Sequence, residues 1–321
     1  MTRLLIVGAP RSGTTWVGEV LGSTEGAIYV NEPDGDHEPF AYKARRQHRI
    51  VPEMHPGDSS PNFERLWAGA FAGGLRSGQL RDKIARRLYG ASPVDDRWEV
   101  WLGGRESLRL RAAAAFARPP VGPQDAAHVV VKSVRAELCV DWIVDNFAPT
   151  ILIVERNPLN ALSSWIELGY ARDPRECAVL GEVARDHWGI TPPSTSAPLL
   201  TRQAFSFGVL AGALRDARIA HPGWRVVSHE ELCTDPARTF QTLAGDLGLT
   251  WNAVAAEHVQ QADRSGVGYM TNRRAREQPE RWRERLNDDQ VQEIMAALAQ
   301  LPHDLFASDN KRPPQQGPHH Q

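Results

Sequence analysis

Residues 4–16 read Leu4-Leu5-Ile6-Val7-Gly8-Ala9-Pro10-Arg11-Ser12-Gly13-Thr14-Thr15-Trp16. The first four are apolar and the run stops at a glycine, which is typical of a short strand buried on both faces. A glycine-containing loop follows, and a helical pattern over Thr15–Leu21 begins directly after it. A strand, a glycine loop and a helix in this order point backbone N–H groups and a helix N-terminus at an anion. The stretch therefore predicts a phosphate-binding loop.

Further short apolar runs with the same buried-strand character recur along the chain, and helical patterns separate them. The runs are Val129–Val131, Ile151–Val154 and Val226–Val227, and the clearest later helical patterns are Leu159–Gly169 and Ala204–Ile219. Alternating strands and helices favour an α/β fold, here three α/β/α layers around a central parallel sheet. We expect one domain over residues 1–305 and a disordered polar tail over 306–321. The interval of about 34–124 lacks a convincing strand and is predicted to be a helical insertion that contributes to an acceptor site.

Composition excludes several classes of protein. The chain has 321 residues, 41% of them hydrophobic, and a formal net charge of −2. This is an ordinary globular mixture, and its near-neutral charge argues against nucleic acid or an anionic membrane as a partner. The three cysteines are too few and too scattered for a disulfide framework or a zinc site. With no signal peptide or membrane segment recognisable, we expect a cytoplasmic protein of open oligomeric state.

The loop differs from that of nucleotide kinases and ATPases at one position. Its spacing approaches the G-x-x-x-x-G-K-[ST] pattern, but Thr14 stands where the lysine belongs. That lysine reaches the β- and γ-phosphates of a nucleoside triphosphate, so its absence counts against a kinase or hydrolase. The cation of this loop is Arg11 instead.

The loop resembles that of the sulfotransferase superfamily that uses 3′-phosphoadenosine 5′-phosphosulfate (PAPS). There a P-[KR]-S-G-T-T-[WL] loop grips the 5′-phosphosulfate, which implies a P-loop NTPase-like sulfotransferase fold. The resemblance implies that Arg11 contacts the bridging oxygen and the transferring sulfuryl group. The loop residues that would hold the donor are Arg11, Ser12, Gly13, Thr14 and Thr15.

A second motif follows the run Ile151–Val154. The family places an arginine at this strand's end and a serine eight residues on, both on the donor's 3′-phosphate, and Arg156 and Ser164 have that spacing. Two weaker matches follow. The resemblance puts His229 near the adenine, with a capping or core role as the alternative. It also places the basic loop that contains Arg274 and Arg276 over the 3′-phosphate, with an ordinary solvated helix start as the alternative.

Sulfuryl transfer needs a base for the acceptor's proton. Cytosolic members use a histidine two residues after a lysine at a strand end; here Lys132 is followed at that position by Val134. Other branches use a glutamate after the second strand, and Glu32 follows Arg11 by 21 residues, as in the tyrosylprotein branch. We predict that Glu32 is the base, with its pKa raised beside an apolar strand end, and that Lys132 neutralises the sulfuryl oxygens. The alternatives are a surface glutamate and a snorkelling lysine.

The resemblance implies an enzyme that moves a sulfuryl group from PAPS, without a metal, to a hydroxyl or amine of a small molecule or carbohydrate. A tyrosyl group or a natural-product phenol is the alternative acceptor, and a P-loop kinase or hydrolase or a PAPS sensor is the alternative function. Residues 41–118 carry 15 Lys and Arg against 8 Asp and Glu, which would attract an acidic acceptor or simply be solvated. Three tryptophans there would stack on a ring or fill a core: Trp67, Trp98 and Trp101.

Overall fold

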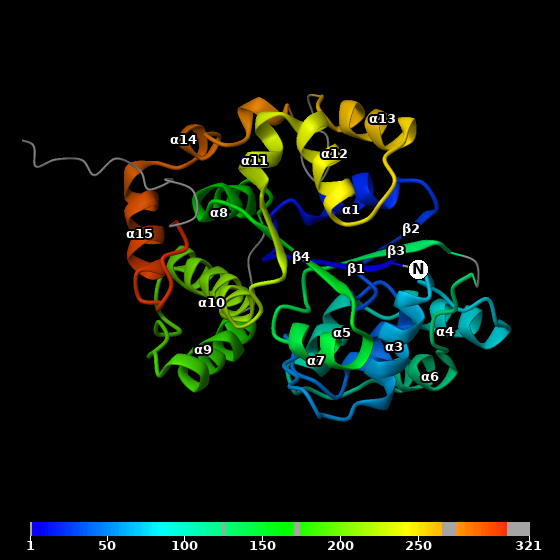
Figure 1. Ribbon diagram of the computed structural model, residues 1–321. Coiled ribbons are helices and arrows are strands. Elements are labelled where there is room, and N and C mark those ends of the chain that lie inside the picture. Colours follow the sequence, from blue (N-terminus) through cyan, green and yellow to red (C-terminus); the bar gives the residue numbers. More distant parts are fainter. Residues whose placement is uncertain (1, 124–125, 170–173, 265–273, 307–321) are drawn as a thin grey trace, which may run out of the picture.

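The computed structural model describes residues 2–123, 126–169, 174–264 and 274–306. One sheet of parallel strands runs through it in the order β2-β3-β1-β4-β5. Its strands are β1 (Thr2–Val7), β2 (Ala27–Asn31), β3 (His128–Ser133), β4 (Thr150–Glu155) and β5 (Arg225–Ser228). Helices cover both faces (Figure 1). The predicted three-layer α/β/α fold with a central parallel sheet is therefore confirmed.

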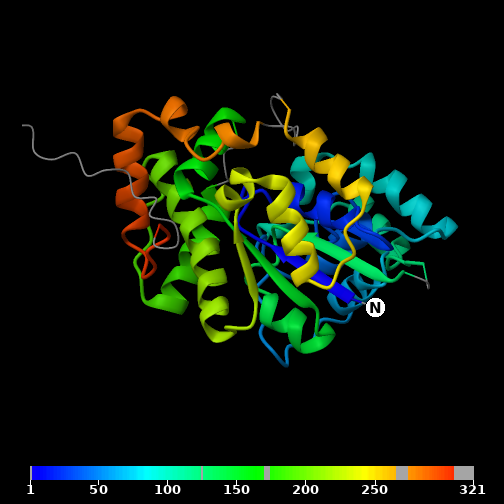
Figure 2. The same cartoon turned by 45° about the horizontal axis from the view of Figure 1, so that its top comes forward.

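Alternate residues of β1 enter opposite cores, as the period of a strand requires. Leu4 and Ile6 pack with the helices on one face, and Leu5 and Val7 pack with those on the other. The first face is covered by α1 (Thr14–Gly22), α11 (His229–Thr234), α12 (Pro236–Asp246) and α13 (Ala253–Ala262). Figure 2 shows α12, in yellow, lying over the strands on this face.

The opposite face carries α3 (Pro61–Phe71) and α7 (Val140–Phe147), with α2 (Pro39–Arg45), α4 (Leu80–Gly90), α5 (Val94–Trp101) and α6 (Leu108–Phe116) around them. Helices α2–α6 thus fill the interval between β2 and β3. The contribution of this interval to an acceptor site stays a prediction, and so do the limits of the domain at residues 1–305. From residue 307 onward, the predicted tail lies outside the described residues.

A third group of helices lies beyond β4 and β5, at the left of Figure 1. It contains α8 (Pro158–Glu167), α9 (Pro174–Trp188), α10 (Leu199–Ala220), α14 (Trp282–Arg285) and α15 (Asp288–Leu298), with the 3₁₀ helix η1 (Ala275–Glu277) leading into α14. Buried residues of α8, α9, α10 and α15 share one core with buried residues of α2, α4, α5 and α6. Among the described residues, no helix combines the length and apolar character needed to cross a membrane.

Candidate active site

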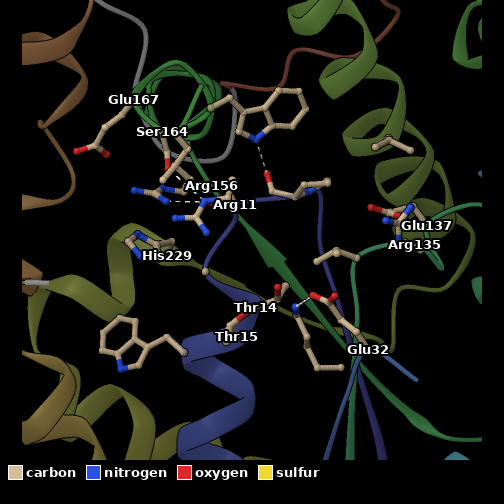
Figure 3. Close-up of a pocket in the computed structure, with 18 of the residues that line it drawn as sticks. Arg11, Thr14, Thr15, Glu32, Arg135, Glu137, Arg156, Ser164, Glu167 and His229 are labelled. Carbon is tan, nitrogen blue, oxygen red and sulfur yellow. Dashed lines mark hydrogen bonds and ion pairs between the residues drawn. The ribbon is translucent and has the colours of Figure 1, made fainter. Parts of the chain in front are cut away.

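The carboxyl ends of all five strands meet at one edge of the sheet, and each supplies a residue to the same cavity of about 630 Å³. Such an edge is where ligands bind in open parallel sheets. Arg11 follows β1, Glu32 follows β2, Lys132 lies at the end of β3, Arg156 follows β4 and His229 follows β5. Figure 3 shows Arg11, Arg156 and Ser164 gathered on one side of this cavity and Glu32 on another.

The loop after β1 has the backbone geometry of an anion-binding site. Arg11 and Gly13 both have left-handed backbones, with φ of 71° and 93°. Helix α1 begins at Thr14 without a side-chain cap, which leaves its first N–H groups for a ligand. A Cβ on Gly13 would lie 2.4 Å from Cδ2 of His229, so both the backbone angle and the space require glycine here.

Arg156 and Ser164 meet Arg11 beside this loop. Nη1 of Arg156 donates to the carbonyl oxygen of Arg11 at 2.8 Å, and Nε of Arg11 donates to Oγ of Ser164 at 3.1 Å. The enclosed Nε of Arg156 has no hydrogen-bond partner among the described residues. Burial lowers the pKa of Arg156 to about 10, although the nearby Glu230 carboxylate opposes that shift. A half-buried guanidinium with an unused donor fits a phosphate ligand.

Local sequence fixes where Arg156 points. Asn157 caps α8 by accepting a hydrogen bond from the backbone N–H of Leu159 at 2.9 Å, and Pro158 occupies the first helical position. Glu230 accepts a hydrogen bond from the backbone N–H of Asn157 at 3.1 Å. The strand end that carries Arg156 is therefore tied to α11.

His229 is the first residue of α11, which a capping box of Ser228 and Glu231 begins. Its ring lies edge-on to Trp16, with centroids 5.9 Å apart, and close to Gly13. The side chain is 7% exposed and lines the cavity. His229 thus packs on the phosphate loop, and its contact with an adenine stays a prediction.

Glu32 and Lys132 form an ion pair on the cavity wall, in which Nζ of Lys132 donates to Oε1 of Glu32. Lys132 is almost fully buried, and the side chain of Glu32 is 21% exposed. Desolvation by burial would raise the pKa of Glu32. The neighbouring imidazole of His37 and the charge of Lys132 outweigh it and lower the pKa to about 2. The expectation of a raised pKa is therefore wrong, because it took account of the apolar strand end and not of this partner.

Not every predicted donor residue reaches the cavity. Arg11, Gly13, Thr14, Thr15, Glu32, Lys132, Arg156, Ser164 and His229 line it. Ser12 is buried beneath the loop, with its backbone N–H bonded to the carbonyl of Ala9. Arg274 and Arg276 are exposed and do not line the cavity, and Arg274 pairs with Glu277 at 3.2 Å. Arg273 lies outside the described residues.

Among the cavity residues that the sequence did not indicate are His37, Arg135 and Arg285. Arg285 pairs with Glu167 of α8 at 2.7 Å. Its one signal in the sequence was its place in the basic stretch after Trp282. Arg135 pairs with Asp36, at 3.8 Å, and follows β3 by two residues.

The helices between β2 and β3 bring one tryptophan to the cavity. Trp98 of α5 lines it together with Ile50 and Val51, whereas Trp67 and Trp101 are 0% and 3% exposed and belong to the cores. All 15 Lys and Arg of residues 41–118 are among the described residues, and none lines the cavity. Their charge does not attract an acceptor into the site by direct contact.

Known proteins that are similar to this chain include several sulfotransferases. No family model matches the sequence. Human carbohydrate sulfotransferase 1 is 26% identical over an alignment that covers 97% of this chain and 81% of the relative. Among solved structures, a sulfotransferase domain of the curacin biosynthetic pathway has 11% identity and a TM-score of 0.45, covering 93% of this chain and 97% of its own. A sulfotransferase from Alicyclobacillus acidocaldarius has 16% identity and a TM-score of 0.40, covering 98% and 97%.

The similarity to the human relative extends along almost the whole chain. The two motifs of the sequence, the loop at Arg11 and the Arg156–Ser164 pair, lie far apart in the chain and come within hydrogen-bond distance in the fold. The chain is thus similar to a sulfotransferase in overall sequence, and its two matching motifs lie at one site.

Proposed function

We propose that the protein transfers a sulfuryl group from PAPS to a hydroxyl or amine of a small-molecule or carbohydrate acceptor and releases 3′,5′-ADP. One observation carries the proposal: two arginines with a serine, and a glutamate with a lysine, line the same cavity at the carboxyl edge of the sheet. The two arginines and the serine can bind the phosphates of a sulfuryl donor. The glutamate and the lysine can act on the acceptor hydroxyl and the sulfuryl group.

The residues proposed to bind PAPS form two groups, one for each end of the molecule. Arg11 and the N-terminus of α1, which begins at Thr14, would hold the 5′-phosphosulfate. Arg156 and Ser164 would hold the 3′-phosphate, for which the buried Nε of Arg156, which has no partner among the described residues, supplies a donor. The hydrogen bond between Arg11 and Ser164 joins the two groups, so they form one continuous anion site.

Glu32 and Lys132 would act on the reacting atoms. As the acceptor oxygen bonds to sulfur, the bond from sulfur to the bridging oxygen breaks and its electron pair stays on the leaving 3′,5′-ADP. Arg11 and Lys132 would stabilise charge on the bridging and sulfuryl oxygens, and Glu32 would take the acceptor's proton. The left-handed backbone of Glu32, with φ of 47°, is a strain of the kind found at active sites.

The acceptor would lie against the wall that Trp98, Ile50 and Val51 form. An indole face beside apolar side chains suits a sugar ring or a phenol, since both present flat apolar surface and hydroxyls. Similarity to a carbohydrate sulfotransferase favours the sugar, and a phenol is the alternative. We further propose a cytoplasmic location, in keeping with three buried cysteines that form no disulfide.

The test has two arms. Calorimetric titration in EDTA should show binding of 3′,5′-ADP and no binding of ATP, because Thr14 stands where ATP-binding loops carry the lysine that reaches the β- and γ-phosphates. Radiolabelled PAPS is then offered with a neutral disaccharide, a uronate-containing disaccharide and 4-nitrophenol. Sulfation of any of them in EDTA supports the proposal. If the protein instead binds ATP in a Mg²⁺-dependent way and does not bind 3′,5′-ADP, the proposed function is contradicted and the kinase alternative is favoured.

A further inference from the structure

Glu32 has a second neighbour besides Lys132. Lys132 donates to Oε1, and Nε2 of His37 lies 3.8 Å from Oε2. All three residues line the cavity. Each oxygen of the carboxylate therefore faces a different basic group, one buried and one largely exposed.

The turn between Glu32 and His37 is held in place. The backbone N–H of Gly35 donates to the carbonyl oxygen of Glu32 at 2.9 Å. Oγ of Ser133 lies 2.9 and 2.8 Å from the two carboxylate oxygens of the fully buried Asp34 and donates to that carboxylate. The backbone between Glu32 and His37 is thus fixed to the end of β3, which places the imidazole close to Glu32.

A proton that reaches Glu32 is poorly retained there. Lys132 and His37 favour the carboxylate over the carboxylic acid, and the pKa is about 2. The neighbouring carboxylate of Glu32 raises the pKa of His37 above its ordinary value, although burial opposes that shift. Near neutral pH the imidazole is therefore the better proton acceptor of the two.

We infer that His37 takes the acceptor's proton from Glu32 and passes it to solvent, as a proton-relay residue that acts through Glu32. The inference rests on the proposed function. The acceptor's O–H bond breaks as its oxygen bonds to sulfur, the proton moves to Oε2 of Glu32 and then to Nε2 of His37, and water removes it. The side chain of His37 is 69% exposed, which gives water direct access.

Three charged groups set the titration of His37. Glu32 and Asp36 favour the imidazolium, and Arg135 across the turn opposes it. A protonated His37 cannot accept a second proton. The rate of sulfuryl transfer should therefore fall as the pH drops through the pKa of His37.

The test compares two histidines in similar surroundings. His37→Gln is the variant and His55→Gln the control, because the side chain of His55 is 65% exposed, lies 3.6 Å from Glu53 and does not line the cavity. Single-turnover rates are measured with radiolabelled PAPS and the best acceptor of the panel above. His37→Gln should lose about tenfold or more in rate, with unchanged affinity for 3′,5′-ADP, and should lose the acid limb of the pH profile. Added imidazole should restore much of the rate, and His55→Gln should match the wild type.

A His37→Gln rate and pH profile equal to those of the wild type would overturn the relay, and so would a loss that imidazole does not restore. A second measurement needs no acceptor. The pKa of His37, followed by NMR, should fall in Glu32→Gln, and an unchanged value also refutes the relay. A wild type that binds no 3′,5′-ADP and sulfates nothing refutes the proposed function instead, so the two failures are distinguishable.

Discussion

Replacing Arg156 by alanine tests how the protein recognises the 3′-phosphate. PAPS differs from adenosine 5′-phosphosulfate by that one group, so discrimination comes from the residues that touch it. Nη1 of Arg156 is engaged by the carbonyl of Arg11, whereas its enclosed Nε has no partner among the residues that the structure describes. Arg156→Ala should therefore weaken binding of 3′,5′-ADP far more than binding of 5′-AMP.

The magnitude follows from the donors that remain. One hydrogen bond between charged groups contributes about 1.5–3 kcal/mol, which corresponds to roughly ten- to somewhat over a hundredfold in Kd. The variant also frees the carbonyl of Arg11, so both nucleotides lose some affinity. The ratio of the two losses isolates the 3′-phosphate, and it should be at least about tenfold.

The assay is calorimetric titration of both nucleotides against wild type, Arg156→Ala and Arg156→Lys. The lysine keeps the charge and loses the paired donors, so it should give an intermediate ratio. Arg218→Ala is the matched control: Arg218 bonds Glu155, at the end of the same strand, and does not line the cavity. Equal losses for 3′,5′-ADP and 5′-AMP in Arg156→Ala would refute the assignment.

Three further outcomes are expected. Glu32→Gln should lower kcat by about 10²–10⁴-fold while 3′,5′-ADP binds as before, and a near-normal single-turnover rate would remove Glu32 as the base. Gly13→Ala should lower the free energy of unfolding, measured with urea, by about 1–2 kcal/mol from its φ of 93° alone. It should also weaken the binding of 3′,5′-ADP measured by calorimetry. Adding His229→Ala should relieve the steric clash but not the backbone strain. Because Glu32 titrates near 2 when folded, against 4.5 ordinarily, its ion pair stabilises the protein above pH 4.5. The stability advantage over Glu32→Gln should then shrink as the pH falls toward 2, and a constant difference would contradict the pairing.

The central sheet could be predicted because each strand carries its own signal. The apolar runs Leu4–Val7 and Ile151–Val154 lie inside β1 and β4, and each strand extends beyond its run by one or two residues. Parallel strands end at one edge of the sheet, so the polar residues just after the runs come together there. Arg11 and Arg156 do, although 145 positions separate them.

The acceptor side of the site could not be predicted in the same way. Trp98 reaches the cavity because α5 packs beside the sheet, and nothing in its local sequence distinguishes it from Trp101, which is buried in the core. The pKa of Glu32 depends on Lys132, which is 100 positions away, and on His37 across a turn. Contacts between residues this far apart in the sequence depend on tertiary packing. The local sequence pattern around each residue does not determine that packing.

Each side of the cavity contains a residue with a strained backbone that another residue of the site holds in place. Arg11 and Glu32 are among the few described non-glycine residues with a positive φ, and each is tethered by another residue of the site. Nη1 of Arg156 holds the carbonyl of Arg11, and the carbonyl of Lys132 accepts the backbone N–H of Glu32 at 2.7 Å. Strained backbones persist only where their surroundings impose them. The residue proposed to recognise the 3′-phosphate therefore also shapes the loop that faces the sulfuryl group, so a donor that lacks this phosphate should also be held less well for reaction.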